Sequence, residues 1–356
     1  MTRRAMVIGT GLIGGSVGIA LREQGWHVSA VDRDDEAAKR AVDLGAADVI
    51  GEDPHADLTV VATPVRAIPA AVLRALEITN GVVTDVGSVK ATVADAVTDG
   101  RFVPGHPMAG SEQDGIEGAV TGLFDGATWV LCPSQSTDDS SYATVRSIVA
   151  SLGAEIVALE PQRHDELVAV VSHVPHLTAA TLMGVAADRS FEHRALLRLA
   201  AGGFRDMTRI SAGRPDIWPD ICAENRGAIV EVLDALMAEL GQLRTTVADG
   251  NREGLLEVLE RARAARRNLP VRAVHPGELT EVQVPVFDRP GELRDITTLA
   301  AELDVNIYDF EITHSAEGRR GIVHVIVDTA VAERLQGGLM AQGYRPSLRP
   351  LDAGEG

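Results

Sequence analysis

Cysteine is scarce in this chain of 356 residues. Its two cysteines, Cys132 and Cys222, lie far apart and lack the spacing of metal ligands. Small secreted domains held together by disulfides need several cysteines, so a disulfide framework is excluded and a reducing compartment is expected. We expect both thiols to be buried apolar groups.

Positive charge and long apolar runs are scarce as well. The formal net charge is -18 at pH 7, which argues against a nucleic-acid partner because binding to phosphate backbones requires a basic face. The chain does not start with the charged n-region and following apolar h-region of a signal peptide, and no run of about 18 apolar residues occurs. We therefore expect a cytoplasmic protein with no membrane or nucleic-acid partner.

A glycine-rich turn near the start is the most informative feature that is present. Gly9, Gly11 and Gly14 follow the apolar stretch Ala5–Ile8 and open a helical pattern over 12–24. In a strand-turn-helix setting the first glycine permits the tight turn, the second lets backbone approach a pyrophosphate, and the third lets helix pack on strand. Helix amide groups then face the anion. The pattern predicts a dinucleotide-binding site.

The end of the next predicted strand indicates which dinucleotide binds. Asp32 lies where a carboxylate accepts from both ribose hydroxyls and repels a 2′-phosphate, which favours NAD. The neighbouring Arg33 can stack on adenine or bind a phosphate, so NADP stays open. The candidate cofactor-binding residues are Gly9, Gly11, Leu12, Ile13, Gly14, Asp32, Arg33, Thr63 and Ser88.

Three segments follow one another along the chain. In residues 1–160 short β-branched runs alternate with helical patterns, which predicts an α/β Rossmann domain with a doubly wound parallel sheet. The predicted strands are Met6–Ile8, Val28–Val31, Leu58–Ala62, Gly81–Val86, Thr128–Leu131 and Ile156–Leu159.

The second and third segments have different patterns. Residues 161–270 should form an all-α domain, since apolar residues recur at helical spacing over 163–187 and 219–243. The apolar face at 229–240 is broader than a surface helix needs, which fits either subunit pairing or a core. Residues 278–350 follow the order strand, helix, strand, strand, helix, strand, which predicts a small α+β ferredoxin-like domain.

His106 and Ser88 are the candidates for acid–base chemistry. Oxidation of a hydroxyl by hydride transfer needs a group that takes the hydroxyl proton, and histidine suits this task near neutral pH. Both residues follow predicted strands or apolar pairs, so both should lie at the carboxyl edge of the sheet, which faces the ligand crevice. Ser88 could orient the imidazole or contact the nicotinamide. A turn histidine beside a capping serine is the structural alternative.

The helical segment carries two further polar clusters. His173 and His176 share a helix face, and Pro175 between them deforms the turn. Zinc would need a third ligand, and none is obvious, so no metal is expected. Arg209 offers a planar fork for a substrate carboxylate, with a surface ion pair to Asp206 as the alternative.

Together these motifs resemble the prephenate/arogenate dehydrogenase family of tyrosine biosynthesis, from Gly9 to about Leu269. The matching pieces are GTGLIGGS (9–16), DVGSVK (85–90), GHPMAGSE (105–112), SHVPH (172–176), FRDMTRI (204–210) and DIWPDICAENR (216–226). The resemblance implies NAD(P)-dependent oxidative decarboxylation of a cyclohexadienyl acid. It also implies a Rossmann domain, a helical dimerisation domain and a homodimer.

The same resemblance implies residue roles. His106 would hydrogen-bond the ring 4-hydroxyl and take its proton while hydride leaves C4, with Ser88 orienting the imidazole. Arg209 would bind a substrate carboxylate. The other implied substrate-binding residues are His176, Ser111, Glu112, Asp206 and Trp218.

The last segment resembles an ACT domain, a module that commonly senses amino acids. The turn from Asp288 to Gly291 matches its strand-to-helix ligand turn. Feedback inhibition by L-tyrosine is therefore a hypothesis, with Asp288, Pro290, Gly291 and Asn306 as ligand residues. A domain that serves only as a dimer contact is the alternative.

Several alternatives stay open on the sequence. We expect prephenate as the substrate, but family members that accept arogenate or both share these motifs. A β-hydroxyacid dehydrogenase would use a lysine in its helical domain, and the chain has no lysine after Lys90. A non-enzymatic regulatory protein that binds NAD and an amino acid should lack the base or the anchor, yet His106, Ser88 and Arg209 are all present.

Overall fold

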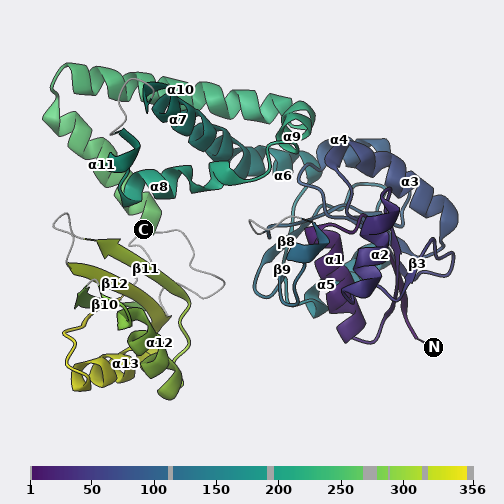
Figure 1. The fold of residues 1–356 in the computed structure, drawn as a ribbon. Helices are drawn as coiled ribbons and strands as arrows, with labels where there is room; N and C mark the ends of the chain where they lie inside the picture. The colour runs from purple at the N-terminus through teal and green to yellow at the C-terminus, as the bar shows by residue number, and fades with distance from the viewer. Residues whose placement is uncertain are drawn as a thin grey trace. The chain divides into compact units, whose positions relative to one another are not determined.

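The computed structural model describes residues 2–110, 115–190, 196–267, 279–287, 289–314 and 320–350. The chain divides into two compact units, Met1–Glu239 and Leu240–Gly356, and each is described by itself (Figure 1). The boundary falls inside the predicted helical segment. Three predicted site residues, Ser111, Glu112 and Asp288, lie outside the described residues.

The first unit contains a six-stranded parallel sheet. Its strands are β1 (Arg4–Ile8), β2 (His27–Val31), β3 (Val49–Ile50), β4 (Leu58–Val61), β5 (Val82–Asp85) and β6 (Phe102–Val103). Their order is β3-β2-β1-β4-β5-β6, so the strand order reverses between β1 and β4. In doubly wound sheets the ligand crevice opens at that point, outside the carboxyl ends of the strands. The helices that follow these strands are α1 (Leu12–Glu23), α2 (Asp35–Asp43), α3 (Ile68–Ile78) and α4 (Ala91–Ala96).

A second, three-stranded sheet follows. It consists of β7 (Gly105–Pro107), β8 (Thr128–Leu131) and β9 (Glu155–Ala158), with α5 (Asp139–Ser151) between the last two. β7 and β8 are antiparallel, whereas β8 and β9 are parallel. The expectation that 128–131 and 156–159 extend the parallel sheet is therefore wrong. Pro104 separates β6 from β7 and has no N–H to donate to a ladder, which helps to end the first sheet there.

Helices cover both faces of the parallel sheet, because successive residues of a strand point to opposite sides. On β1, Val7 packs in a core with Leu21 of α1 and Val145 of α5. Its neighbour Met6 packs on the other side with Ile68 of α3. This arrangement confirms the predicted doubly wound architecture of the first segment.

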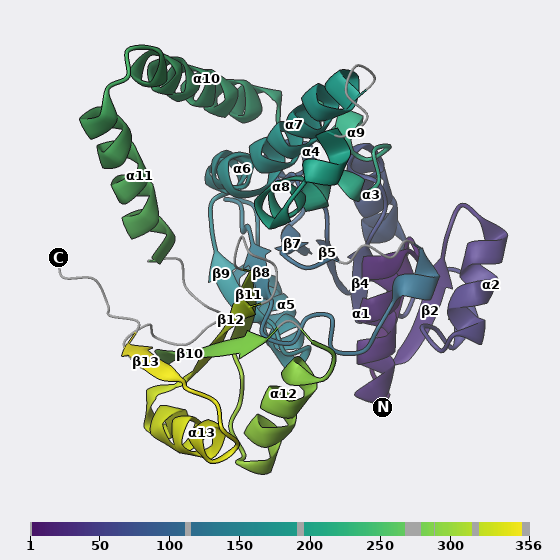
Figure 2. The ribbon, with the colours of Figure 1, turned by 60° about the vertical axis from the view of Figure 1, so that its left-hand side comes forward.

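The helices of the second segment are α6 (Pro161–Val168), α7 (Val174–Ser190), α8 (Gly202–Thr208), α9 (Trp218–Glu224), α10 (Arg226–Ala248) and α11 (Arg252–Arg267). A π-helical stretch, Ala169–His173, joins α6 to α7, in which Pro175 is the second residue and has no N–H to close the preceding turn. Asn225 separates α9 from α10 inside the region expected to be one helix. α4 contacts α6, and Figure 1 and Figure 2 both show these two helices near each other.

The continuous helical stretch Pro161–Arg189 is long and apolar enough, by length and composition, to cross a membrane. The sequence analysis found no such run because polar residues between 172 and 176 interrupt it. Its buried side chains His164, Asp165 and His173 hydrogen-bond residues on other elements.

The second unit contains the predicted α+β segment. Its elements are β10 (Leu279–Phe287), α12 (Glu292–Glu302), β11 (Asp309–His314), β12 (Arg320–Asp328), α13 (Thr329–Ala341) and β13 (Ser347–Pro350). They form an antiparallel sheet of order β11-β12-β10-β13. Alternate residues such as Val284 and Val325 point to one face and pack on Ile296 of α12 and Leu335 of α13. The predicted order of elements is confirmed.

Candidate active site

The glycine turn between β1 and α1 has two crowded positions and one open one. Gly9 has φ +96°, and a Cβ there would lie 2.4 Å from the carbonyl oxygen of Ala62 on the neighbouring chain segment. A Cβ on Gly14 would lie 2.0 Å from the oxygen of Gly9, whereas one on Gly11 would meet nothing within 4 Å. Packing therefore requires glycine at two positions, and the third borders open space of the kind a pyrophosphate needs.

The turn also fixes the predicted ribose-binding acid. Asp32, one residue beyond β2, accepts the Thr10 N–H at 2.7 Å and the Thr10 hydroxyl at 2.9 Å through one carboxylate oxygen. Its other oxygen accepts the N–H of Asp34 at 3.1 Å. The exposed Arg33 lies between these two residues. The sequence analysis missed Thr10, although its place inside the motif, one residue before Gly11, was the available signal.

These residues fit a dinucleotide. The first amide groups of α1, at Leu12, Ile13 and Gly14, have no carbonyl partner within the helix and can face an anion. Just beyond β4, the hydroxyl of Thr63 is buried and has no hydrogen-bond partner among the described residues. That orphaned donor beside Gly9 is the kind of group that a bound cofactor satisfies.

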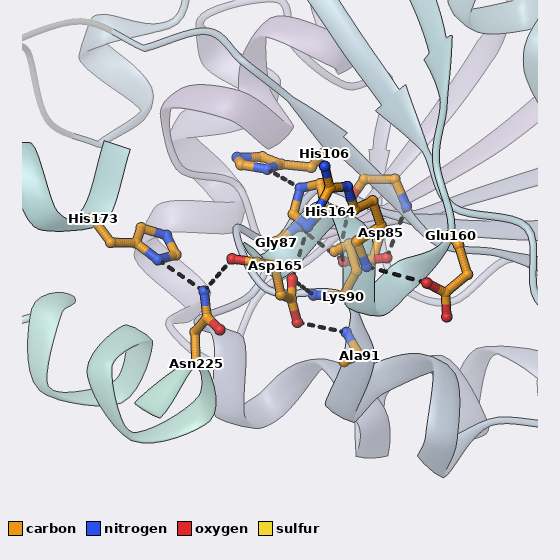
Figure 3. Close-up of polar contacts among 12 residues, drawn as sticks. Asp85, Gly87, Lys90, Ala91, His106, Glu160, His164, Asp165, His173 and Asn225 are labelled. Atoms are coloured by element: carbon orange, nitrogen blue, oxygen red, sulfur yellow. Dashed lines mark hydrogen bonds and ion pairs between the residues drawn. The ribbon is translucent and has the colours of Figure 1, made fainter. Parts of the chain in front are cut away.

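His106 lies in β7 and is held by a second histidine. Its Nδ1 atom lies 2.9 Å from Nε2 of His164 on α6, and the two rings meet edge to face (Figure 3). Nδ1 of His164 in turn lies 2.7 Å from Oδ1 of Asp165. His164 has no exposed surface, and Asp165 is 5% exposed. A carboxylate thus reaches the candidate base through an intervening imidazole.

The same carboxylate caps helix α4. Asp165 accepts the main-chain N–H of Lys90 at 2.8 Å and that of Ala91 at 2.9 Å. The N-cap position of α4, Lys90, makes no capping bond with its own side chain, so the acceptor comes from α6 instead. No motif marked His164 or Asp165, because both occupy an otherwise polar helix start, and the sequence analysis missed them.

A buried ion pair fixes the backbone beside His106. The ammonium group of Lys90 pairs with Asp85 and donates to the carbonyl oxygen of Gly105 at 2.7 Å. Asp85 also accepts the N–H groups of Gly87 at 2.9 Å and Gly105 at 3.1 Å. Both charged side chains are fully buried. They join the end of β5 to the start of β7 and so set the position of His106.

The surroundings keep His106 neutral. Its pKa is held well below 6.5, mainly because burial disfavours the cation, with further contributions from His164 and Lys90. The imidazole is therefore unprotonated at neutral pH and can accept a proton.

The predicted role of Ser88 needs correction. Sequence analysis gave Ser88 the task of orienting His106, but the hydrogen bond at Nδ1 is made by His164. Ser88 is half-buried after β5, and none of the hydrogen bonds among the described residues joins it to His106. Its contact with the nicotinamide remains a prediction.

A second polar cluster surrounds Trp218 at the start of α9. His176 stacks on its ring at 3.7 Å between centroids, and His173 meets the ring edge to face at 6.2 Å. The amide nitrogen of Asn225 donates to the carbonyl oxygen of Asp165 at 2.8 Å and lies 3.2 Å from Nδ1 of His173. The break between α9 and α10 thus joins this cluster to the one at His106.

Burial lowers the pKa of His173 to about 4, although Asp165 opposes the shift. Its Nε2 atom is buried without a partner among the described residues. Burial also lowers the pKa of the more exposed His176. Both histidines are therefore neutral at pH 7.

The predicted carboxylate anchor lies at the end of α8. Arg209 starts the 3-10 turn Arg209–Ala212, and both it and Asp206 are exposed. The turn continues to Gly213, where a Cβ would lie 3.9 Å from Cε1 of His176, so this segment borders the Trp218 cluster. Among the described residues no group of three His, Cys, Asp or Glu side chains could hold a metal ion.

The second unit has a separate cavity of about 1180 Å³. It lies at the end of β10 and the start of α12, and its charged and hydroxyl-bearing lining includes Arg289, Glu292, Asp295 and Tyr344. Of the predicted regulatory residues that are described, Pro290, Gly291 and Asn306, none lines it. Pro290 and Gly291 lie between two lining residues, whereas Asn306 is exposed before β11.

Comparison with known families finds two matches along the chain. The family model described as "Prephenate dehydrogenase, nucleotide-binding domain" matches residues 17–158. The one described as "Prephenate dehydrogenase, dimerization domain" matches residues 160–261.

Individual relatives agree with these matches. A prephenate dehydrogenase of Bacillus subtilis (strain 168) is 32% identical over 341 residues, which cover 90% of this chain and 91% of the relative. A cyclohexadienyl dehydrogenase of Zymomonas mobilis is 33% identical over 275 residues, 73% of this chain and 94% of the relative.

Solved structures are similar too. Prephenate dehydrogenase from A. aeolicus, in complex with hydroxyphenyl propionate and NAD+, has a TM-score of 0.71 at 28% identity and covers 76% of this chain and 99% of that one. Arogenate dehydrogenase from Synechocystis has a TM-score of 0.66 at 31% identity and covers 74% and 98%.

Proposed function

Because the chain belongs to the prephenate dehydrogenase family, we propose that it oxidises and decarboxylates prephenate with NAD, and that His106 is the base. The observation that carries this assignment is the position of His106 in β7, directly after the last strand of the parallel sheet, where His164 holds its Nδ1 atom and burial keeps its pKa below 6.5. The carboxyl edge of that sheet is the dinucleotide crevice. A neutral imidazole there is suited to take the proton of a hydroxyl group under oxidation.

NAD, when bound, supplies the acceptor for the hydride from C4 of the ring. Nε2 of His106 is the ring nitrogen that His164 leaves available, and it accepts the proton of the 4-hydroxyl group. The bond from C1 to the ring carboxylate then breaks, carbon dioxide leaves, and its electron pair makes the ring aromatic. The proton returns to the phenol oxygen, and the product is 4-hydroxyphenylpyruvate. Since aromatisation drives the reaction, the protein mainly has to position its groups.

The substrate would lie between His106 and the Trp218 cluster. Arg209 is the proposed partner of a substrate carboxylate, because a guanidinium binds carboxylates in a bidentate manner. The stacked pair His176 and Trp218 offers a rigid wall beside it. The remaining proposed contacts are Ser111, Glu112 and Asp206.

The test is the initial rate of NADH or NADPH formation by the purified protein, with prephenate or arogenate as substrate. We expect the highest kcat/KM with prephenate and NAD. A higher value with arogenate would assign that substrate instead, and similar values would assign a cyclohexadienyl dehydrogenase. Absence of turnover in all four combinations would support the non-enzymatic, regulatory alternative.

We also propose a homodimer formed by the helical segment. Met237 on α10 is 67% exposed, and Val230, Leu240 and Val247 on the same helix are also exposed. A stripe of this kind is typical of a subunit interface. Light scattering should give twice the monomer mass, and Met237→Asp should shift the protein toward monomer. A wild-type monomer at assay concentration would contradict the proposal.

Regulation by L-tyrosine is a second proposed activity, and the resemblance of the second unit to an ACT domain supports it. Glu292 is 6% exposed, accepts the Tyr344 hydroxyl at 2.9 Å and pairs with Arg289 at the cavity wall. Charges of both signs in one cavity suit the ammonium and carboxylate of an amino acid.

The proposed regulation predicts inhibition of turnover by L-tyrosine. Glu292→Gln should weaken that inhibition without changing the uninhibited kcat. Equal inhibition of both proteins would place the tyrosine site elsewhere, and no inhibition of wild type would leave the domain as a dimer contact.

A further inference from the structure

We propose that Asp165 and His164 act together as positioning residues that fix the tautomer of His106. The proposal rests on His106 being the base of the proposed function. It concerns three residues from two separate segments, β7 and α6, which are linked in a single chain of hydrogen bonds (Figure 3).

The direction of each bond follows from the chemistry of the groups. An ionised carboxylate only accepts hydrogen bonds, so Nδ1 of His164 must donate to Asp165. In a neutral His164 the other nitrogen, Nε2, carries no proton and can only accept. In that form of His164, the 2.9 Å contact is made by donation of the Nδ1 proton of His106 to His164. His106 is left with a bare Nε2, the form that a general base needs.

Asp165 is suited to start this chain because it is held rigidly. It accepts the main-chain N–H groups of Lys90 and Ala91 in addition to His164, and it is 5% exposed. Main-chain donors cannot rotate away as side chains do. Its carbonyl oxygen is also bonded by Asn225 from the α9–α10 break. The carboxylate therefore points in one direction only.

These hydrogen bonds also stabilise His106 after it has accepted the proton. When His106 takes up a proton, its hydrogen bond to His164 stabilises the positive charge. Asp165 strengthens that hydrogen bond because it polarises the His164 ring. Among the residues that the structure describes, the charged or titratable groups around the ring are His164, Asp165, His173 and the internal pair of Lys90 with Asp85. Since Lys90 is paired with Asp85, Asp165 is the described carboxylate that balances the new charge.

The tautomer can be measured without turnover. In protein with 15N-labelled histidine, imidazole nitrogens with and without a proton have well-separated shifts, and His106→Asn assigns the His106 signals. We expect wild-type His106 to be protonated at Nδ1 and bare at Nε2. A wild-type His106 protonated at Nε2 would overturn the proposal whatever the enzyme's activity.

Two substitutions of His164 test its hydrogen bond to His106. His164→Phe keeps a ring of similar shape but has no acceptor, and His164→Gln restores an acceptor oxygen. We expect the phenylalanine variant to lose the Nδ1–H form and roughly 10- to 100-fold in kcat, as is typical when a partner that orients a functional histidine is removed, with unchanged affinity for NAD. The glutamine variant should recover part of both.

Asp165→Asn tests the role of the carboxylate that binds His164, since it keeps the shape of the side chain but removes its charge. It should shift His106 toward the other tautomer and lower kcat while the KM for NAD stays constant. If Asp165→Asn changed the tautomer of His106 but kept the wild-type kcat, the hydrogen bonds from Asp165 through His164 to His106 would have a structural role only. Wild-type turnover by His106→Asn would instead contradict the assignment of His106 as the base, whereas the tautomer measured in the wild type would be unaffected. Failure of the proposed function and failure of the tautomer proposal are therefore distinguishable.

Discussion

Oδ1 of Asp165 accepts the main-chain N–H of Lys90 over 2.8 Å, although 75 residues separate the two in the sequence. With the neighbouring bond to Ala91, this carboxylate joins α6 of the helical segment to α4 of the nucleotide-binding segment. His106, the proposed base, is bonded to His164, the residue next to Asp165. Its position therefore depends on the correct packing of both segments.

Removal of that carboxylate should destabilise the first unit. Asp165→Ala leaves buried donors at Lys90, Ala91 and His164 without an acceptor, and we expect the free energy of unfolding to fall by roughly 3 kcal/mol. Glu166→Ala, next in sequence, is the control. Its exposed pair with Arg163 should contribute less than about 1 kcal/mol. Urea unfolding compares them, and equal losses would contradict the account.

The two lysines of the protein should differ sharply in their contribution to stability. Lys90→Met leaves Asp85 buried without its cation and should cost about 3 to 5 kcal/mol of stability. Lys39 forms an exposed pair with Glu36, so Lys39→Met should leave the stability almost unchanged. Thermal unfolding of both variants measures the difference. If the Lys90→Met protein were as stable as wild type, the buried pair of Lys90 and Asp85 would not stabilise the junction of β5 and β7 as described.

The glycines of the turn should separate folding from cofactor binding. A Cβ on Gly11 meets nothing within 4 Å, so Gly11→Ala should keep wild-type stability but weaken NAD binding at least about tenfold, or roughly 1.4 kcal/mol. Gly14→Ala places its Cβ 2.0 Å from a backbone oxygen and should lower stability as well. Calorimetry with NAD and thermal unfolding give both values. Unchanged NAD affinity in Gly11→Ala would place the pyrophosphate elsewhere.

The pH dependence of turnover should reflect the lowered pKa of His106. The active form is the neutral imidazole, and its pKa lies well below 6.5 because the ring is buried near His164 and Lys90. As the pH falls through 6.5 the base therefore stays neutral, and kcat should remain constant until the pH nears the lower pKa. A pH–rate profile with saturating substrates tests this. Half-loss of kcat at or above pH 6.5 would be the contrary result.

Much of the fold could be predicted from local patterns. The glycine turn, the strands β1, β2, β4 and β5 and the order of elements in the second unit follow from spacing within short windows, whereas the two-residue strand β3 was not predicted. The second sheet could not be predicted in this way, because the runs at 128–131 and 156–159 look the same whether they extend one sheet or form another. The break at Asn225 was hidden by continuous helical periodicity on either side.

The site was predicted in part. His106, His176 and Trp218 lie in motifs that marked them, and the structure brings the last two into a stack. His164 and Asp165 have no signal in the sequence, because their function arises only when α6 docks on α4. The partner that orients His106 was predicted to be Ser88, and the partner at Nδ1 is His164, which comes from a segment distant in the sequence.

The most direct test of the account is a comparison of wild type with His106→Asn, by NAD binding and by the rate of NADH formation from prephenate. Asparagine keeps a polar side chain of similar reach but cannot serve as a base. We predict unchanged NAD affinity and thermal stability, with kcat reduced by at least about 1000-fold. Turnover within a few fold of wild type would contradict the assignment of His106.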